Sequence, residues 1–163
     1  MTDSVGLLLN ELEKQDLTKL FASGQLDELI YRELFDGLGT SARVVKELSS
    51  AGVQLNVTAL LTEAQIQDVC DALSPTTPSV VSVFAGRIAD AGVDPVPMMK
   101  RASETLRARP MAELLWASPR EVLNLIQAQE CGCHIITMTT DLWTKLGNLG
   151  KDLDRYSLET VKM

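Results

Sequence analysis

The fold of this sequence is decided by the stretch Ser79-Val80-Val81-Ser82-Val83-Phe84-Ala85-Gly86-Arg87. The apolar run at 79–85 predicts a β-strand, and it delivers a hydroxyl, an aromatic ring and a guanidinium to one end. Three similar runs occur elsewhere, separated by helix-like stretches. Strands that alternate with amphipathic helices indicate a parallel sheet whose ligands bind at the carboxyl ends of the strands.

The neighbouring segments continue this alternation. We expect three further strands, at residues 53–61, 112–117 and 134–138. N-cap residues and prolines mark the intervening helices. Thr62 caps a helix at 63–73, Asp94-Pro95 opens one that runs to 107, Ser118-Pro119 opens one that runs to 130, and Thr140 or Asp141 caps a short last helix.

Residues 1–41 are less regular than the rest. Helical spacing at 5–17 and 26–35 flanks a possible short strand at 19–22, and Ser41 follows a turn with two glycines and can cap a helix at 42–50. A complete eight-stranded barrel usually takes about 250 residues, whereas this chain has 163. The sequence therefore predicts one α/β domain over 1–163: an irregular helical segment at 1–41, then a partial TIM-type β/α barrel at 42–163.

Composition argues against two classes of partner. The formal net charge is −7, and no segment supplies the basic face that nucleic-acid binding requires. No apolar run approaches the roughly 20 residues that span a bilayer, and the first residues lack the basic start of a signal peptide. The three cysteines suit a reducing compartment. We expect a cytoplasmic protein that binds neither nucleic acid nor membrane.

One short motif invites a metal hypothesis. Cys131-Gly132-Cys133-His134 brings two thiols and the chain's single histidine together. A zinc site normally needs a second pair of ligands, and the sequence offers none at a suitable spacing. We interpret the motif as the buried start of a strand and expect no metal.

Polar residues gather within or just beyond the carboxyl ends of the predicted strands. Two arginines there suit bidentate phosphate contacts, and a serine at a helix start adds a hydroxyl beside free N–H groups. Taken singly, such an arginine is more often solvated, an aromatic ring is more often core, and an asparagine often bonds a neighbouring strand. Their joint placement predicts a phosphate cradle. The residues are Asn56, Thr58, Ser82, Phe84, Arg87, Ser118 and Arg120.

Four motifs in order resemble the transaldolases, especially the short branch near fructose-6-phosphate aldolase. They are Asn56-Val57-Thr58-Ala59-Leu60, Ser82-Val83-Phe84-Ala85-Gly86-Arg87-Ile88, Leu115-Trp116-Ala117-Ser118-Pro119-Arg120 and the tail from Gly150 to Met163. The resemblance covers roughly residues 42–163 and implies about the last four β/α units of the barrel.

The resemblance also implies a class I aldolase chemistry. A lysine forms a Schiff base with a ketose carbonyl, and a dihydroxyacetone unit passes to an aldehyde, without metal or organic cofactor. By position in the motifs, the phosphate of a sugar phosphate would be bound by Arg87, Ser118 and Arg120. Asn56 and Thr58 would orient the substrate and a water, with Ser82 and Phe84 as pocket walls.

The chain departs from the family at the lysine. The family carries it in a Val-Lys-Ile-Pro-like run on the strand before Asn56, and this sequence has no such run. Lys46 lies ten residues before Asn56 and is interpreted as a solvated helix residue. Three hypotheses follow: an enzyme whose lysine lies elsewhere or that is active in an assembly, an inactive sugar-phosphate-binding remnant, or an interaction protein. Because a half barrel exposes two sheet edges, we expect a homo-oligomer.

Overall fold

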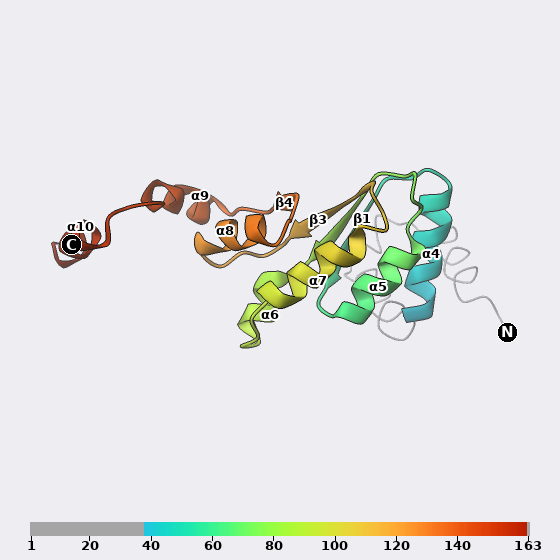
Figure 1. The fold of residues 1–163 in the computed structure, drawn as a ribbon, viewed down its shortest axis with the longest axis horizontal. Helices are drawn as coiled ribbons and strands as arrows, with labels where there is room; N and C mark the ends of the chain where they lie inside the picture. The colour runs from blue at the N-terminus through green and yellow to red at the C-terminus, as the bar shows by residue number, and fades with distance from the viewer. Residues whose placement is uncertain (1–37, 163) are drawn as a thin grey trace, which may run out of the picture.

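The computed structural model describes residues 38–162, with side chains from Ala42 onward. Expectations for the earlier part of the chain, including the strand at 19–22 and the helices at 5–17 and 26–35, lie outside the described residues. Within them, strands and helices alternate as expected (Figure 1).

Four strands form one parallel sheet in the order β1-β2-β3-β4. Their bounds are β1 (Leu55–Leu60), β2 (Ser79–Val83), β3 (Ala112–Trp116) and β4 (Ile135–Ile136). Each strand pairs with the strand that follows it along the chain, as in the successive β/α units of a barrel. The expectation of a partial TIM-type β/α barrel is confirmed.

One helix precedes β1, and each strand is followed by one or more helices. They are α4 (Leu38–Ser50), α5 (Glu63–Ala72), α6 (Ala85–Asp90), α7 (Val96–Leu106), α8 (Leu123–Glu130), α9 (Thr140–Lys145), a short 3₁₀ helix η1 (Leu146–Asn148) and α10 (Leu153–Val161). Helix α5 begins where its cap predicts. Thr62 accepts a hydrogen bond from the Gln65 amide at 3.2 Å, and the Gln65 side chain accepts one from the Thr62 amide at 3.0 Å. This reciprocal pair satisfies two N–H groups that helix formation leaves free.

Four helix starts differ from the sequence-based expectation. Helix α4 begins at Leu38, before the predicted cap, and the last short helix is capped by Thr139, whose hydroxyl accepts from the Leu142 amide. The segment predicted as the last part of a strand is instead the start of α6, with Phe84 at its N-cap. Helix α8 begins at Leu123, five residues later than expected.

The hydrophobic core lies between the sheet and helices α5 and α7. Val81, Val83, Leu114 and Trp116 project from β2 and β3 into it, each with 0% of its surface exposed. Ile66 of α5 and Met99 of α7 meet them. Since side chains alternate along a strand, the residues between these positions project from the opposite face of the sheet.

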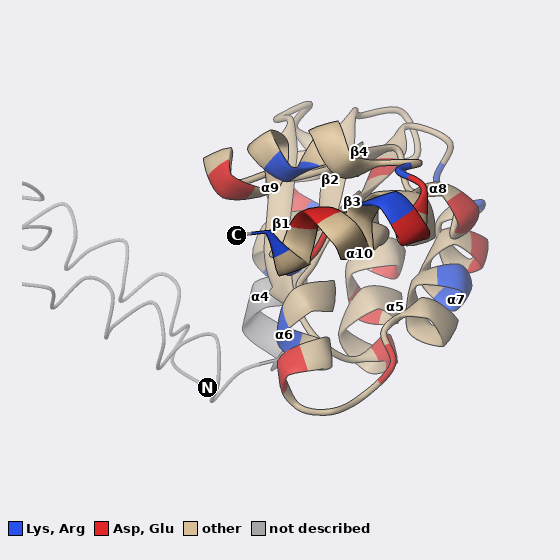
Figure 2. Cartoon of the chain, turned by 90° about the vertical axis from the view of Figure 1, so that its left-hand side faces the viewer, with Lys and Arg blue, Asp and Glu red and all other residues tan. Residues whose placement is uncertain are grey.

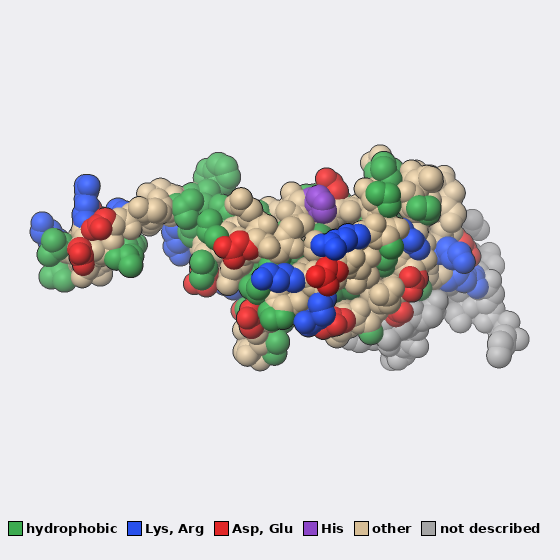
Figure 3. All heavy atoms as spheres, viewed as in Figure 1, with side chains coloured by type: hydrophobic (Ala, Val, Ile, Leu, Met, Phe, Trp, Pro, Cys, Tyr) green, Lys and Arg blue, Asp and Glu red, His purple; other side chains and the backbone are tan. Residues whose placement is uncertain are grey.

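The carboxyl-terminal part of the described chain extends away from this core (Figure 1). Helix α10 buries no residue, and Leu153, Leu158 and Val161 are 77%, 63% and 83% exposed. Hydrophobic side chains are visible at this end of the molecule in Figure 3. Acidic and basic residues are interspersed over the helices (Figure 2). Among residues 38–162, no helix is both long enough and apolar enough to cross a bilayer.

Candidate functional site

Strand β1 presents two polar side chains on the face opposite the core. Leu55 and Val57 pack against the core, whereas Asn56 and Thr58 are exposed, as the predicted alternation requires. Asn56 is the second residue of β1, so it lies further from the carboxyl end than Thr58. The strand then bulges between Val57 and Leu60.

Ser82 of β2 lies beside Thr58 on the same face. The Thr58 hydroxyl donates to the Ser82 hydroxyl at 3.3 Å, and Ser82 is 4% exposed. Phe84 follows β2 as a half-buried residue, and its amide donates to the Leu60 carbonyl at 2.9 Å. The first two strands therefore bring the predicted pair of hydroxyls together, with the aromatic residue at their carboxyl ends.

A glycine brings the end of β2 against the end of β3. The Gly86 amide donates to the Ala117 carbonyl at 3.2 Å, and a Cβ placed on Gly86 would lie 1.5 Å from the Ser118 carbonyl oxygen. Only a glycine allows this approach. The first turn of α6, which carries Arg87, is thus pressed against the loop that carries Ser118 and Arg120.

The loop after β3 corrects the expectation of a helix that opens at Ser118. Ser118 has a φ of 57°, in the left-handed region that helix starts do not use. The side-chain oxygen of Asn124, which is 8% exposed, accepts from the Arg120 amide at 2.7 Å and the Glu121 amide at 3.1 Å. The Ser118 amide donates to the Thr137 hydroxyl at 3.3 Å. These backbone N–H groups already have partners, contrary to the expectation that they are free for a phosphate.

The two predicted phosphate arginines flank one carboxylate. Arg120 Nε donates to Asp90 Oδ1 at 2.9 Å, and Arg120 Nη2 donates to Asp90 Oδ2. The hydrogen bond from Arg120 lowers the pKa of Asp90, partial desolvation opposes this, and the charges of Arg120 and Arg87 lower it further. Arg87 lies one helical turn before Asp90 on α6 and is exposed.

Three further residues of this site were not among those expected from the sequence: Asp90, Asn124 and Thr137. A signal existed for Asp90, because an acid three residues after Arg87 shares its helix face. Asn124 carried a weaker signal, because asparagine favours helix starts. Nothing local pointed to Thr137, which reaches Ser118 from the segment after β4.

No strand of the described sheet carries a lysine. Lys46 lies on α4 and is exposed, as expected of a solvated helix residue. A Schiff-base amine needs a low pKa, which usually comes from burial or a neighbouring positive charge. The four strands therefore supply hydroxyls and an amide, but no amine.

The motif at 131–134 has a structural role. Burial, and then the neighbouring Cys131, raises the pKa of the Cys133 thiol to about 12. His134 Nδ1 accepts from the Leu114 amide at 3.0 Å, and the His134 amide donates to the Leu114 carbonyl at 2.9 Å. The motif thus fastens β4 to β3. Across residues 38–162, no three acidic, cysteine or histidine side chains are grouped to hold a metal ion.

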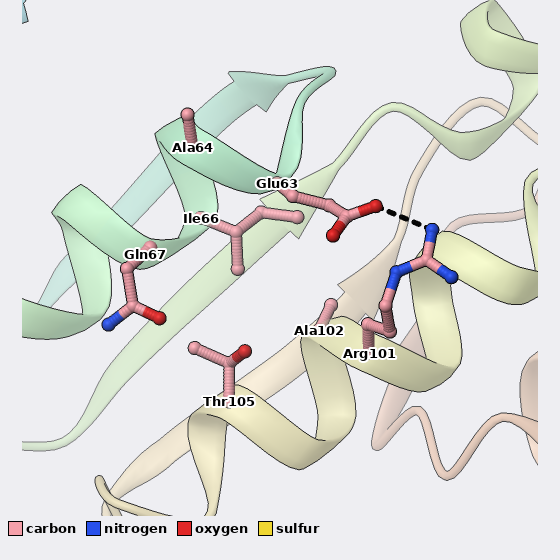
Figure 4. Close-up of a pocket in the computed structure, with 7 residues that line it drawn as sticks. All are labelled: Glu63, Ala64, Ile66, Gln67, Arg101, Ala102 and Thr105. Carbon is pink, nitrogen blue, oxygen red and sulfur yellow. Dashed lines mark hydrogen bonds and ion pairs between the residues drawn. The ribbon is translucent and has the colours of Figure 1, made fainter.

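A hollow of about 280 Å³ lies between α5 and α7, on the helix side of the sheet (Figure 4). Glu63 and Arg101 form an ion pair at its edge, while Ile66 and Ala102 provide apolar surface. The charges of Glu63 and Arg101 are thus paired with each other. The hollow contains none of the side chains predicted to bind phosphate.

Comparison with known proteins agrees with the arrangement of strands and motifs. The sequence profile of the transaldolase/fructose-6-phosphate aldolase family matches residues 39–162. The chain belongs to this family.

Two relatives described as probable transaldolase 2, from Listeria monocytogenes and Listeria innocua, are each 32% identical to it over 105 residues. The alignment covers 64% of this chain and 46% of each relative. The chain therefore matches about half the length of these curated relatives.

Proposed function

We propose that this chain carries the sugar-phosphate-binding part of a transaldolase-type aldolase site. The observation that carries the proposal is the close approach of Gly86 to Ser118. It brings the helix of Arg87 beside the loop of Ser118 and Arg120, so that two guanidinium groups and a hydroxyl lie near one edge of the sheet. Such groups suit a phosphate monoester. Membership of the family supports a sugar phosphate as the ligand.

The residues on the open face of the sheet complete this proposal. Asn56 and Thr58 orient the ketose and a water near the reacting carbonyl, while Ser82 and Phe84 line the pocket. The hydrogen bond between Thr58 and Ser82 supports this assignment because it holds two hydroxyls side by side. Their strands run towards helix α6, which carries Arg87, and towards the loop that carries Arg120.

The proposed reaction is transfer of a dihydroxyacetone unit between sugar phosphates, in carbohydrate metabolism of the pentose phosphate type. A lysine amine adds to the ketose carbonyl and water leaves, giving an iminium. When the bond between the α and β carbons breaks, the β-hydroxyl gives its proton to a base, an aldehyde leaves and the iminium accepts the electron pair. The resulting enamine adds to a second aldehyde, whose oxygen takes up a proton, and water then hydrolyses the new iminium to release the ketose and the lysine. Because β1–β4 carry no lysine, the amine must come from outside these strands.

Borohydride reduction tests the Schiff base. The full chain is incubated with saturating fructose 6-phosphate and borohydride, and peptides are mapped by mass spectrometry. We expect a reduced adduct on one lysine. In a second incubation at one subsaturating concentration of fructose 6-phosphate, the yield should be lower in Arg87→Ala than in the wild type. Absence of any adduct would contradict the reaction. Sugar-phosphate binding without an adduct would instead favour the inactive remnant.

Calorimetry tests the binding part separately. Arg87→Ala should weaken fructose 6-phosphate roughly tenfold or more, because it removes charge-assisted hydrogen bonds. Arg107→Ala is the matched control, since Arg107 is also an exposed arginine but lies at the end of α7. Equal loss of affinity in both variants would indicate a general charge effect and contradict the assigned cradle.

We also propose that the chain forms a homo-oligomer. The outer edges of β1 and β4 pair with no described strand, and parallel strands are normally covered on both faces. The exposed apolar residues of α10 add a second surface that favours association. Sedimentation velocity at micromolar concentration should show a species larger than 17.8 kDa. A single monomeric boundary would contradict this.

A cytoplasmic location is a further part of the proposal. Cys70, Cys131 and Cys133 are free thiols, and reduced cysteines persist in a reducing compartment. Cell fractionation should recover the chain in the soluble cytoplasmic fraction. Recovery in a secreted or membrane fraction would contradict the location.

A further inference from the structure

Asp90 is the last residue of α6 and lies beside both arginines of the proposed phosphate cradle. It accepts two hydrogen bonds from one guanidinium, from Nε and from Nη2 of Arg120. Arg87 lies on the same short helix and acts on the Asp90 carboxylate through its charge. One carboxylate thus connects the helix of Arg87 with the loop of Arg120.

This pairing uses only some of the N–H donors of Arg120. An arginine has five N–H donors in one plane. Asp90 uses the Nε–H and one N–H of Nη2, so both N–H groups of Nη1 and the second one of Nη2 remain. One N–H of Nη1 and the second N–H of Nη2 lie parallel at the end of the guanidinium, a fork that can donate to two phosphate oxygens. The ion pair therefore holds the side chain in place and leaves its remaining N–H groups available to a phosphate.

We propose that Asp90 is a positioning residue, which holds the Arg120 guanidinium so that its free edge meets a phosphate bound with Arg87. The inference rests on the sugar-phosphate site proposed above. Arg120 lies on an exposed loop, and the pair is half exposed, with 44% and 45% of the two side chains accessible. Without a partner, a long side chain in such a place must be ordered when the ligand binds, and this lowers affinity.

Orientation and charge predict effects of opposite sign when Asp90 is replaced. Removing a negative charge near an anion site strengthens anion binding through Coulomb attraction. Losing the orientation of Arg120 weakens it. If Asp90 instead competes with phosphate for Arg120, its removal also strengthens binding. Only the positioning role predicts a net loss of affinity.

Calorimetry with fructose 6-phosphate at constant ionic strength distinguishes these cases. We expect Asp90→Ala to bind about two- to tenfold more weakly than the wild type, the size expected for ordering one long side chain. Asp90→Glu should recover most of the affinity because it restores the carboxylate. Glu63→Ala is the matched control, since it removes the same charge from a similarly exposed pair, Glu63 with Arg101. It should leave affinity unchanged.

A second measurement does not depend on the ligand. In ¹⁵N NMR of the full chain, the Nε–H signal of Arg120 should be shifted and slow to exchange with water, because it is hydrogen bonded. It is identified by its absence in Arg120→Lys. The signal should lose its protection in Asp90→Ala and keep it in Glu63→Ala. An Arg120 signal that is the same with and without Asp90 would overturn the inference.

The outcomes separate the two proposals. A wild type that binds fructose 6-phosphate, together with an Asp90→Ala variant that binds as tightly or more tightly, would overturn the role of Asp90 and leave the sugar-phosphate site standing. A wild type that does not bind fructose 6-phosphate would overturn the site and the role together. Weaker binding by Glu63→Ala to the same extent as Asp90→Ala would also overturn the inference.

Discussion

The two faces of the sheet contrast sharply although their residues alternate along the same strands. On the helix side, Val81 and Leu114 are completely buried. On the other side, Thr58 and Glu113 are exposed, and the buried Ser82 is a hydroxyl that accepts a hydrogen bond. At these positions a single step along a strand separates a completely buried apolar side chain from a polar one on the open face, although Leu115 on that face is also buried. Substitutions at neighbouring positions should reveal this division.

The largest effect should come from Leu114→Ala, compared with a substitution at the neighbouring Glu113. Leu114→Ala removes a fully buried side chain and should lower the free energy of unfolding by about 4 kcal/mol, from lost burial and the cavity left behind. Glu113→Ala, one residue earlier on the open face, should change it by less than about 0.5 kcal/mol. Urea denaturation followed by circular dichroism measures both. Similar losses of unfolding free energy in the two variants would contradict the difference between the two faces.

Gly86→Ala tests the contact between α6 and the loop after β3, at the carboxyl ends of the strands. The new methyl group would collide with the Ser118 carbonyl oxygen, a backbone atom that cannot rotate away. We expect a loss of about 3 kcal/mol in the free energy of unfolding together with loss of fructose 6-phosphate affinity. Gly147→Ala is the control, because nothing lies near a Cβ at that position. Unchanged stability of Gly86→Ala would mean that the start of α6 does not touch the loop after β3.

Packing on the helix side of the sheet also affects the reactivity of the Cys133 thiol. Burial, then Cys131, raises the pKa of Cys133 from 9.0 to about 12. Folding favours the neutral thiol, so its contribution to stability is complete below pH 9 and is lost as the pH rises towards 12. Iodoacetamide at pH 8 should label Cys133 far more slowly in the folded chain than in urea, where mass spectrometry should find all three cysteines modified. Equal rates would contradict burial.

The smallest effect concerns the bulge of β1. Ala59 has a φ of 63°, which costs an alanine more than a glycine. Ala59→Gly should raise the free energy of unfolding by about 0.5 to 1 kcal/mol, the relief of strain minus the added flexibility of the unfolded chain. Ala64→Gly on the exposed side of α5 should lower it by about 1 kcal/mol. A loss of stability in Ala59→Gly, like the loss expected in Ala64→Gly, would show that the bulge is not strained.

Features governed by neighbouring residues were predictable from the sequence. The alternation of Asn56 and Thr58 with Val57 follows from strand geometry, and the Thr62 cap of α5 needs only its own helix. The conformation of Ser118 was not predictable in this way. Its backbone is held by Gly86 from one unit and Thr137 from another, so a local rule for helix starts failed there.

The site was predictable to a similar extent. The motif order brought Arg87, Ser118 and Arg120 to one edge of the sheet, as the fold places them. The partner of Arg120 was not predictable, because Asp90 meets it only after β2, β3 and their loops have packed. The roles of the site residues remain predictions that the proposed binding and trapping experiments address.

The strand order carries a consequence for how this chain reaches its structure. Leu55 pairs with Ser79, Ser79 with Ala112, and Leu115 with Ile135, so each pairing in the described sheet joins consecutive units. Short loops close at a lower entropic cost than long ones. During synthesis on a ribosome, each new strand can therefore dock onto an edge that is already formed, and the sheet can grow in the direction of translation.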